Sequence, residues 1–173
     1  MHASSCRFAG RFAGSVFAVL TVAGSAKAQV LTHHDLPYGL PLTIAQTAVE
    51  SCASKGYAES AVVVDRDGET IVAIRGDNAQ PYTMENARCK AYTAMNFRIP
   101  SAEYAKRFAD NNPVVRQQVT LPNIIAIPGG LPIKLGDEVI GGAGASWAAA
   151  RSTTAKSKSQ AAPRRLGCCY IKP

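Results

Sequence analysis

His33 and His34 offer the most versatile side-chain chemistry in this sequence, and the only other histidine is His2. A neutral imidazole can ligate haem iron or a transition metal near physiological pH. Both residues precede the first predicted helix, so they can join a Ser-His-Asp or Cys-His catalytic set only if residues 29–41 fold back over the domain. We consider them candidate haem or metal ligands, and a solvated pair near a terminus is the alternative.

Three further polar residues lie around the start of a second predicted helix. Asp77 and Glu85 carry carboxylates that can bind a cation, although carboxylates at this position more often cap the exposed N–H groups of a helix start. Tyr82 could supply a phenolate to ferric haem, and packing at the edge of the core is its alternative role. The chain has no Cys-x-x-Cys and no Cys/His spacing typical of structural zinc.

The glycine pair Gly129 and Gly130, between Pro128 and Leu131, is the most distinctive segment. Paired glycines permit positive φ and let the backbone approach a ligand or a neighbouring subunit closely, which makes both residues candidates for cofactor binding. No Gly-Lys-Ser/Thr follows, so the segment is not a P-loop. Residues 141–144 contain three glycines, but they end a predicted hairpin strand and do not open a helix, which disfavours a dinucleotide site.

The elements that must position these residues alternate between helical and strand patterns. Apolar residues recur at helical spacing from Leu42 to Cys52, and two further helices are predicted over residues 82–97 and 101–110, the latter with Ser101 as its N-cap. The predicted strands are 61–64, 70–74, 124–127, 131–135 and 138–141. Four of them form two hairpins with Gly-containing turns. About five strands with three helices between them predict an antiparallel α+β domain.

The N-terminal 28 residues have the pattern of a secretory signal peptide. A basic start is followed by an apolar run over residues 12–23 and by small residues, with Ala26 and Ala28 at the A-x-A positions. The run is shorter than the about 20 residues of a spanning helix. We therefore expect a periplasmic or secreted protein that begins near Gln29 and has no membrane span after cleavage.

The C-terminal residues 145–173 differ in composition from the body of the chain, because they contain no acidic residue and no periodic pattern of apolar residues. A disordered basic extension is the plain interpretation. A frameshift in GC-rich coding DNA is the sharper hypothesis, since suitable codons read two bases out of phase encode a glycine-rich acidic loop and an amphipathic helix. The predicted organisation is therefore a signal peptide over 1–28, a lead-in over 29–41, a domain over 42–144 and this tail.

The net charge of +7 belongs mainly to the two ends. Residues 29–144 carry ten basic and twelve acidic side chains, so the body has no excess of positive charge for a nucleic-acid backbone. Cys52 and Cys89 each lie in a predicted helix, and either a disulfide or two buried thiols fits the sequence.

In this order and spacing, several segments resemble the GlcG/HbpS family, also called the haem-degrading domain family, which includes the C-terminal domain of PduO-type cobalamin adenosyltransferases. The resemblance covers residues 40–144. It rests on Val62-Val63-Val64-Asp65-Arg66-Asp67-Gly68, Arg75-Gly76-Asp77-Asn78-Ala79, Lys90-Ala91-Tyr92-Thr93-Ala94, Pro128-Gly129-Gly130-Leu131-Pro132-Ile133 and Val139-Ile140-Gly141.

The resemblance implies a profilin- or PAS-like antiparallel sheet flanked by helices, assembly into a homo-oligomer, and haem binding in some members. Exported members resemble HbpS, which implies a role in redox sensing with a sensor-kinase partner. Family members continue past the strand at Gly141 into an acidic loop and a last helix, so this chain has lost its C-terminal helix if the tail is frameshifted. The first helix has no histidine, where the PduO-type domain carries its haem ligand.

Three functions remain open at this level. The leading hypothesis is an exported module that binds haem, a related tetrapyrrole or another small molecule without catalysis of its own. An enzyme of haem degradation or small-acid oxidation is the second, but no nucleophile–base pair is evident in the sequence. A non-catalytic structural oligomer, whose glycines serve packing alone, is the third.

Overall fold

The computed structural model describes residues 31–149, so the predicted signal peptide over 1–28 and most of the basic tail lie outside the described residues. The helices are α1 (Gly39–Ala53), α2 (Pro81–Phe97), α3 (Ser101–Ala109) and α4 (Pro113–Gln118). The strands are β1 (Tyr57–Asp65), β2 (Thr70–Arg75), β3 (Gly130–Leu135) and β4 (Glu138–Ala149). No helix in this part of the chain is both long and apolar enough to cross a membrane.

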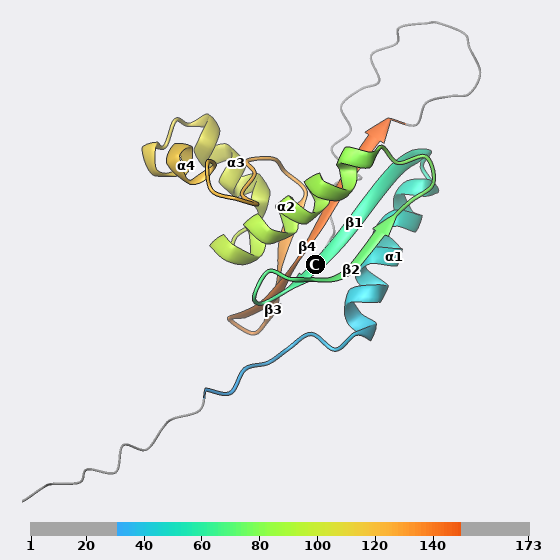
Figure 1. Ribbon diagram of the computed structural model, residues 1–173, viewed down its shortest axis with the longest axis horizontal. Helices are drawn as coiled ribbons and strands as arrows, with labels where there is room; N and C mark the ends of the chain where they lie inside the picture. The colour runs from blue at the N-terminus through green and yellow to red at the C-terminus, as the bar shows by residue number, and fades with distance from the viewer. Residues whose placement is uncertain (1–30, 150–173) are drawn as a thin grey trace, which may run out of the picture. The chain divides into compact units, whose positions relative to one another are not determined.

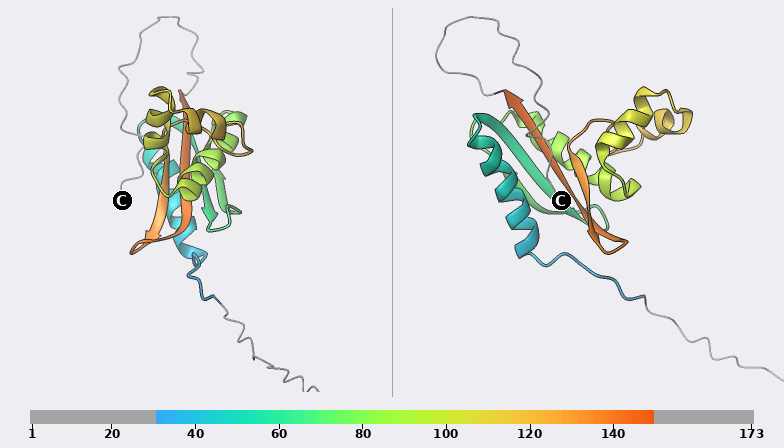
Figure 2. Two further views of the ribbon diagram at one scale, coloured as in Figure 1. Left: turned by 90° about the vertical axis from the view of Figure 1, so that its left-hand side faces the viewer. Right: turned by 180° about the vertical axis from the view of Figure 1, so that it is seen from behind.

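The four strands form one antiparallel sheet in the order β2-β1-β4-β3, as Figure 1 shows. Strand β1 is central and its residues alternate between two cores: Ala61 and Val63 pack on the side of α1, while Val62 and Val64 pack on the side of α2. The two helices therefore cover opposite faces of the sheet (Figure 2). The predicted antiparallel α+β class is confirmed, with four strands in place of about five.

Helix α2 lies unusually close to the sheet because glycines on β3 and β4 face its backbone. A Cβ atom on Gly144 would lie 2.6 Å from the backbone nitrogen of Ala91 and 3.1 Å from the carbonyl carbon of Ala87. Gly130 faces the carbonyl group of Lys90 in the same way. Real Cβ atoms do not approach backbone this closely, so these positions require glycine for packing.

The first predicted hairpin is confirmed, and its turn is fixed by local hydrogen bonds. One carboxylate oxygen of Asp65 accepts hydrogen bonds from the backbone N–H groups of Asp67 and Glu69, both at 2.9 Å. Gly68 adopts a positive φ of 88°, which glycine tolerates without steric cost. The tight Asp-Gly turn thus sets the register in which β1 and β2 pair.

The predicted strand over residues 124–127 is wrong. The backbone of this segment forms hydrogen bonds with side chains and not with a neighbouring strand. The N–H of Ile125 donates to the hydroxyl of Thr93 at 3.0 Å. Ile124 is buried in a small separate core formed with α3 and α4. An apolar run of four residues cannot distinguish this extended segment from a strand.

The sequence predicts Ser101 as the cap of α3, but Pro100 occupies the N-cap position and the Ser101 hydroxyl has another role. The hydroxyl is buried, donates to the carbonyl of Ile127 and accepts from the N–H of Gly130, both at 2.8 Å. The short helix α4, which the sequence reasoning missed, is capped by the side chain of Asn112, which accepts two backbone hydrogen bonds.

Strand β4 continues to Ala149, past the predicted domain boundary at residue 144. Ala145 and Ser146 are buried, and the strand pairs with β1 as far as Tyr57. Five residues assigned to the tail therefore belong to the sheet, since the N-terminal half of β1 needs a partner. At the other end, α1 begins at Gly39, inside the predicted lead-in.

Cys52 and Cys89 do not form a disulfide. They lie on α1 and α2, which cover opposite faces of the sheet. Cys52 is buried and Cys89 is partly exposed. Of the two alternatives that the sequence left open, thiols are the one found.

Candidate functional site

The lead-in contacts the domain through His34 and Leu36, and it brings His34 to the start of β4. The Nδ1 atom of His34 lies 2.7 Å from a carboxylate oxygen of Glu138, a residue 104 positions away in the sequence. The guanidinium of Arg66 contacts the other oxygen of Glu138 at 3.4 Å. The hydrogen bond with His34 is the main cause that lowers the pKa of Glu138 below its ordinary value, and the charge of Arg66 acts in the same direction.

Leu36 holds the lead-in in this position. It is 8% exposed and belongs to the core on the α1 side of the sheet. Its side chain occupies the space beside Gly141, where a Cβ atom would collide with it and with the Val64 carbonyl, each at 2.5 Å. The sequence reasoning missed this apolar contact because Leu36 is an isolated apolar residue outside any periodic segment.

The predicted haem-binding residues lie at separate points along β4. His34 contacts Glu138, the first residue of the strand, whereas Gly129 contacts Ala145: a Cβ atom there would lie 2.8 Å from the Ala145 carbonyl oxygen. Seven residues of strand separate these points by roughly 23 Å. The side chain of His33, like that of His34, is exposed.

Gly129 and Gly130 face the protein's own helix α2, as their contacts show. The Lys90 side chain lies 3.3 Å from the position of a Cβ atom on Gly129, and its ammonium donates to the carbonyl of Ala145 at 3.0 Å. Tyr82 lies in the first turn of α2 and is 56% exposed. The close backbone approach predicted for the glycine pair therefore serves packing between the helix and the sheet.

Asp77 and Glu85 make different contacts. Glu85 accepts hydrogen bonds from Arg88, at 2.5 and 3.1 Å, and these bonds lower the pKa of Glu85. Neither residue is the N-cap of α2, which is Gln80 without a side-chain cap. Within residues 31–149, no group of three or more His, Cys, Asp and Glu side chains is placed to hold a metal ion.

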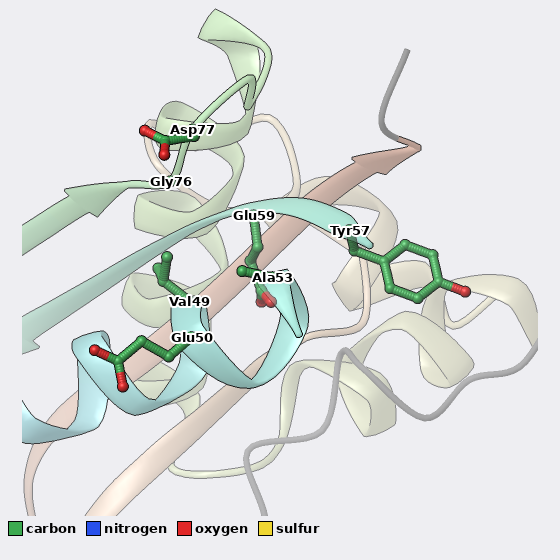
Figure 3. A pocket seen from close by; sticks show the side chains of 7 residues that line it. All are labelled: Val49, Glu50, Ala53, Tyr57, Glu59, Gly76 and Asp77. Carbon is green, nitrogen blue, oxygen red and sulfur yellow. The ribbon is translucent and has the colours of Figure 1, made fainter. Parts of the chain in front are cut away.

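Asp77 instead borders a pocket of about 290 Å³ between the end of α1, the start of β1 and the end of β2 (Figure 3). Glu59 of β1 forms part of its inner wall, and its side chain points from the strand toward α1. The pocket is lined by Val49, Glu50, Ala53, Tyr57, Glu59, Gly76 and Asp77.

Glu59 is the most unusual residue of this pocket, because it is only 1% exposed and neither carboxylate oxygen has a nitrogen or oxygen hydrogen-bond partner among the described residues. Burial raises the pKa of Glu59, although a hydrogen bond from the Cys52 thiol, which is a weak donor, and the charges of Lys90 and Lys55 act in the opposite direction. Sequence reasoning missed this residue because the predicted strand began at Ala61, two positions later.

Comparisons with known proteins agree with this architecture. A family model described as haem degrading protein HbpS-like matches residues 40–155. Among curated proteins, none matches the chain.

Solved structures give the same result. A crystal structure of HbpS is 31% identical, with 73% of this chain and 87% of that chain covered and a TM-score of 0.66. A double mutant of HbpS from Streptomyces reticuli is 28% identical, with 87% and 88% covered and a TM-score of 0.63. A complex of PduOC with haem is 20% identical, with 68% and 86% covered and a TM-score of 0.61, a likeness that concerns the fold. The chain belongs to the HbpS-like family of haem-degrading proteins.

Proposed function

We propose that this chain is an exported haem-binding protein and that His34 is the protein ligand to the haem iron. The observation that carries the assignment is the hydrogen bond between His34 Nδ1 and Glu138. A histidine that ligates a metal almost always donates its other ring N–H to a carboxylate or carbonyl, which fixes the tautomer and raises the basicity of the ligating nitrogen. Glu138 would perform this role and leave Nε2 for iron.

The surroundings of His34 support the same group. The His34 side chain is 66% exposed, so a ligand as large as haem can approach the ring from solvent. Arg66 is only 24% exposed and contacts Glu138 near His34. Its guanidinium would offer a positive charge to a propionate of haem bound at His34. Bound haem would supply redox chemistry at its iron, and the protein would orient and tune it through His34 and Glu138.

Export is supported by the signal-peptide pattern over residues 1–28. Redox sensing with a sensor kinase and assembly into a homo-oligomer are proposals that rest on the family resemblance alone. Sequencing the N-terminus of the secreted product tests the proposed signal peptide. Cleavage after Ala28 is expected, and an intact N-terminus on the exported protein would contradict it.

Haem titration followed by absorption spectroscopy tests the assignment of the ligand. The wild-type protein should give a saturable Soret shift, which His34→Ala should abolish and the neighbouring His33→Ala should preserve. Glu138→Gln should weaken haem affinity by about 10- to 100-fold, which is the typical effect of losing the carboxylate that accepts a hydrogen bond from a ligating histidine. A shift that survives in His34→Ala would refute the ligand, and no shift in the wild type would refute haem binding itself.

A further inference from the structure

The pocket that contains Glu59 lies apart from the proposed haem ligand. Its charged groups are the carboxylates of Glu50, Glu59 and Asp77, and no basic side chain is among its described lining residues. Haem carries negative propionates, which such a pocket would repel. A pocket of about 290 Å³ is near the lower limit of small-molecule sites, so it suits a small ligand, and its carboxylates favour one with a positive charge.

Glu59 provides the reason for a ligand. A buried carboxylate whose nearest donor is a thiol costs free energy, because a thiol is a weak hydrogen-bond donor and buried carboxylates usually have stronger partners. The residue lies in the central strand, and its backbone carbonyl accepts the N–H of Gly76 at 2.8 Å, so the backbone at Glu59 is fixed. Gly76 has no side chain, and a Cβ atom there would lie 2.9 Å from Val49. Glycine therefore allows the backbone to pass close to Val49 at this edge of the pocket.

We propose that this pocket binds a small organic cation, whose ammonium group pairs with the Glu59 carboxylate, while Glu50 and Asp77 add negative charge to the lining. Val49 and Ala53 of α1 provide an apolar wall for an alkyl chain. Tyr57 also borders the pocket, with its ring directed away from Glu59 (Figure 3). This mixture of carboxylates and apolar groups fits an alkylammonium ion better than a hydrated metal ion, which would need a fuller set of oxygen ligands.

The molecule contains its own reporter for this site. Trp147 is the single tryptophan of the chain, and its ring lies edge-on to Tyr57 with centroids 4.9 Å apart. A ligand that shifts Tyr57 changes the environment of Trp147, so tryptophan fluorescence of the purified full chain can follow binding without a label.

The experiment titrates n-butylamine and 1-butanol, which have the same shape and differ in charge at neutral pH. A saturable fluorescence change is expected with the amine and not with the alcohol. Glu59→Gln, which keeps the shape of the side chain, should weaken binding by about 10- to 100-fold, the range expected for a lost hydrogen bond between charged groups. Glu69→Gln, an exposed carboxylate in the β1–β2 turn, is the matched control and should bind as the wild type does.

Three outcomes would overturn the proposal: equal binding of amine and alcohol, no binding of the amine to the folded wild type, or undiminished binding to Glu59→Gln. Competition by Ca²⁺ at equal concentration would also overturn the proposal, because it would identify a metal ion as the ligand of the pocket. Circular dichroism checks that Glu59→Gln is folded. If Glu59→Gln does not fold, Asp77→Asn provides an independent test and should show a smaller loss of affinity. His34→Ala should bind the amine normally, so this proposal and the proposed haem site succeed or fail separately.

Discussion

Replacing Gly144 by alanine tests the close packing of α2 on the sheet. Non-bonded heavy atoms are normally separated by about 3.5 Å, whereas the new Cβ atom would lie 2.6 Å from the Ala91 nitrogen. The helix backbone would have to move by at least about 0.9 Å, because the carbonyl oxygen of Ala87 lies even closer to the same methyl group. Helix α2 also packs on β1 and β3, so a local shift disturbs most of the core on this face.

Overpacking of this kind typically costs about 1–3 kcal/mol. Loss of unfolded-state entropy works in the opposite direction by about 0.4–1 kcal/mol where alanine fits without strain. The obstructing atoms belong to helix backbone and cannot rotate away, so we expect Gly144→Ala to lower the free energy of unfolding by about 2 kcal/mol.

Urea denaturation followed by circular dichroism measures the effect, with Gly39→Ala as the control. A Cβ atom on Gly39 would meet no other atom within 4 Å, and this glycine has no positive φ. Its replacement in the first turn of α1 should therefore be neutral or slightly stabilising. A Gly144→Ala midpoint equal to that of Gly39→Ala, at unchanged slope, would refute the claim that the glycine is required for helix–sheet contact.

Other substitutions test single contacts in the same denaturation assay. Glu59→Leu should raise stability at neutral pH by about 1–3 kcal/mol, because it removes a buried carboxyl group without a nitrogen or oxygen hydrogen-bond partner among the described residues. Because the folded pKa of Glu59 is raised above its ordinary value of 4.5, the wild type should lose stability as pH rises from that value through the folded pKa; a wild-type pH profile parallel to that of Glu59→Leu would contradict this. Ser101→Ala should cost about 1–3 kcal/mol, since the hydroxyl satisfies both Ile127 and Gly130, and an unchanged midpoint would exclude that role. Asn112→Ala should cost about 1 kcal/mol through the lost cap of α4, whereas Asn112→Asp should restore most of it.

The local elements of this fold follow from the sequence. The turn from Asp65 to Gly68 is specified by residues adjacent in the chain, because a carboxylate two to four positions away satisfies its backbone. Helix α2 is likewise bounded by Pro81 at its start and by Arg98, in the left-handed conformation, after its end. Such signals act over a few residues, and the corresponding predictions agree with the structure to within a few positions.

The segments without a periodic pattern were decided by tertiary contacts. Residues 124–127 have the composition of a strand, but Thr93 and Ser101 satisfy their backbone from two helices. Strand β4 runs on into residues 145–149 because the N-terminal part of β1 pairs with it. Neither result could be read from the composition of the segment itself, since the partners lie tens of residues away.

The sequence by itself determined the α+β class, the two hairpins, the three longer helices and the histidine pair as candidate ligands. Only the tertiary structure decided that His34 meets Glu138 across 104 positions and that Glu59 is buried beside a pocket. The physical reason is the same in both cases. Backbone conformation responds to neighbouring residues, whereas the environment of a side chain depends on which strands pair and which face a helix covers.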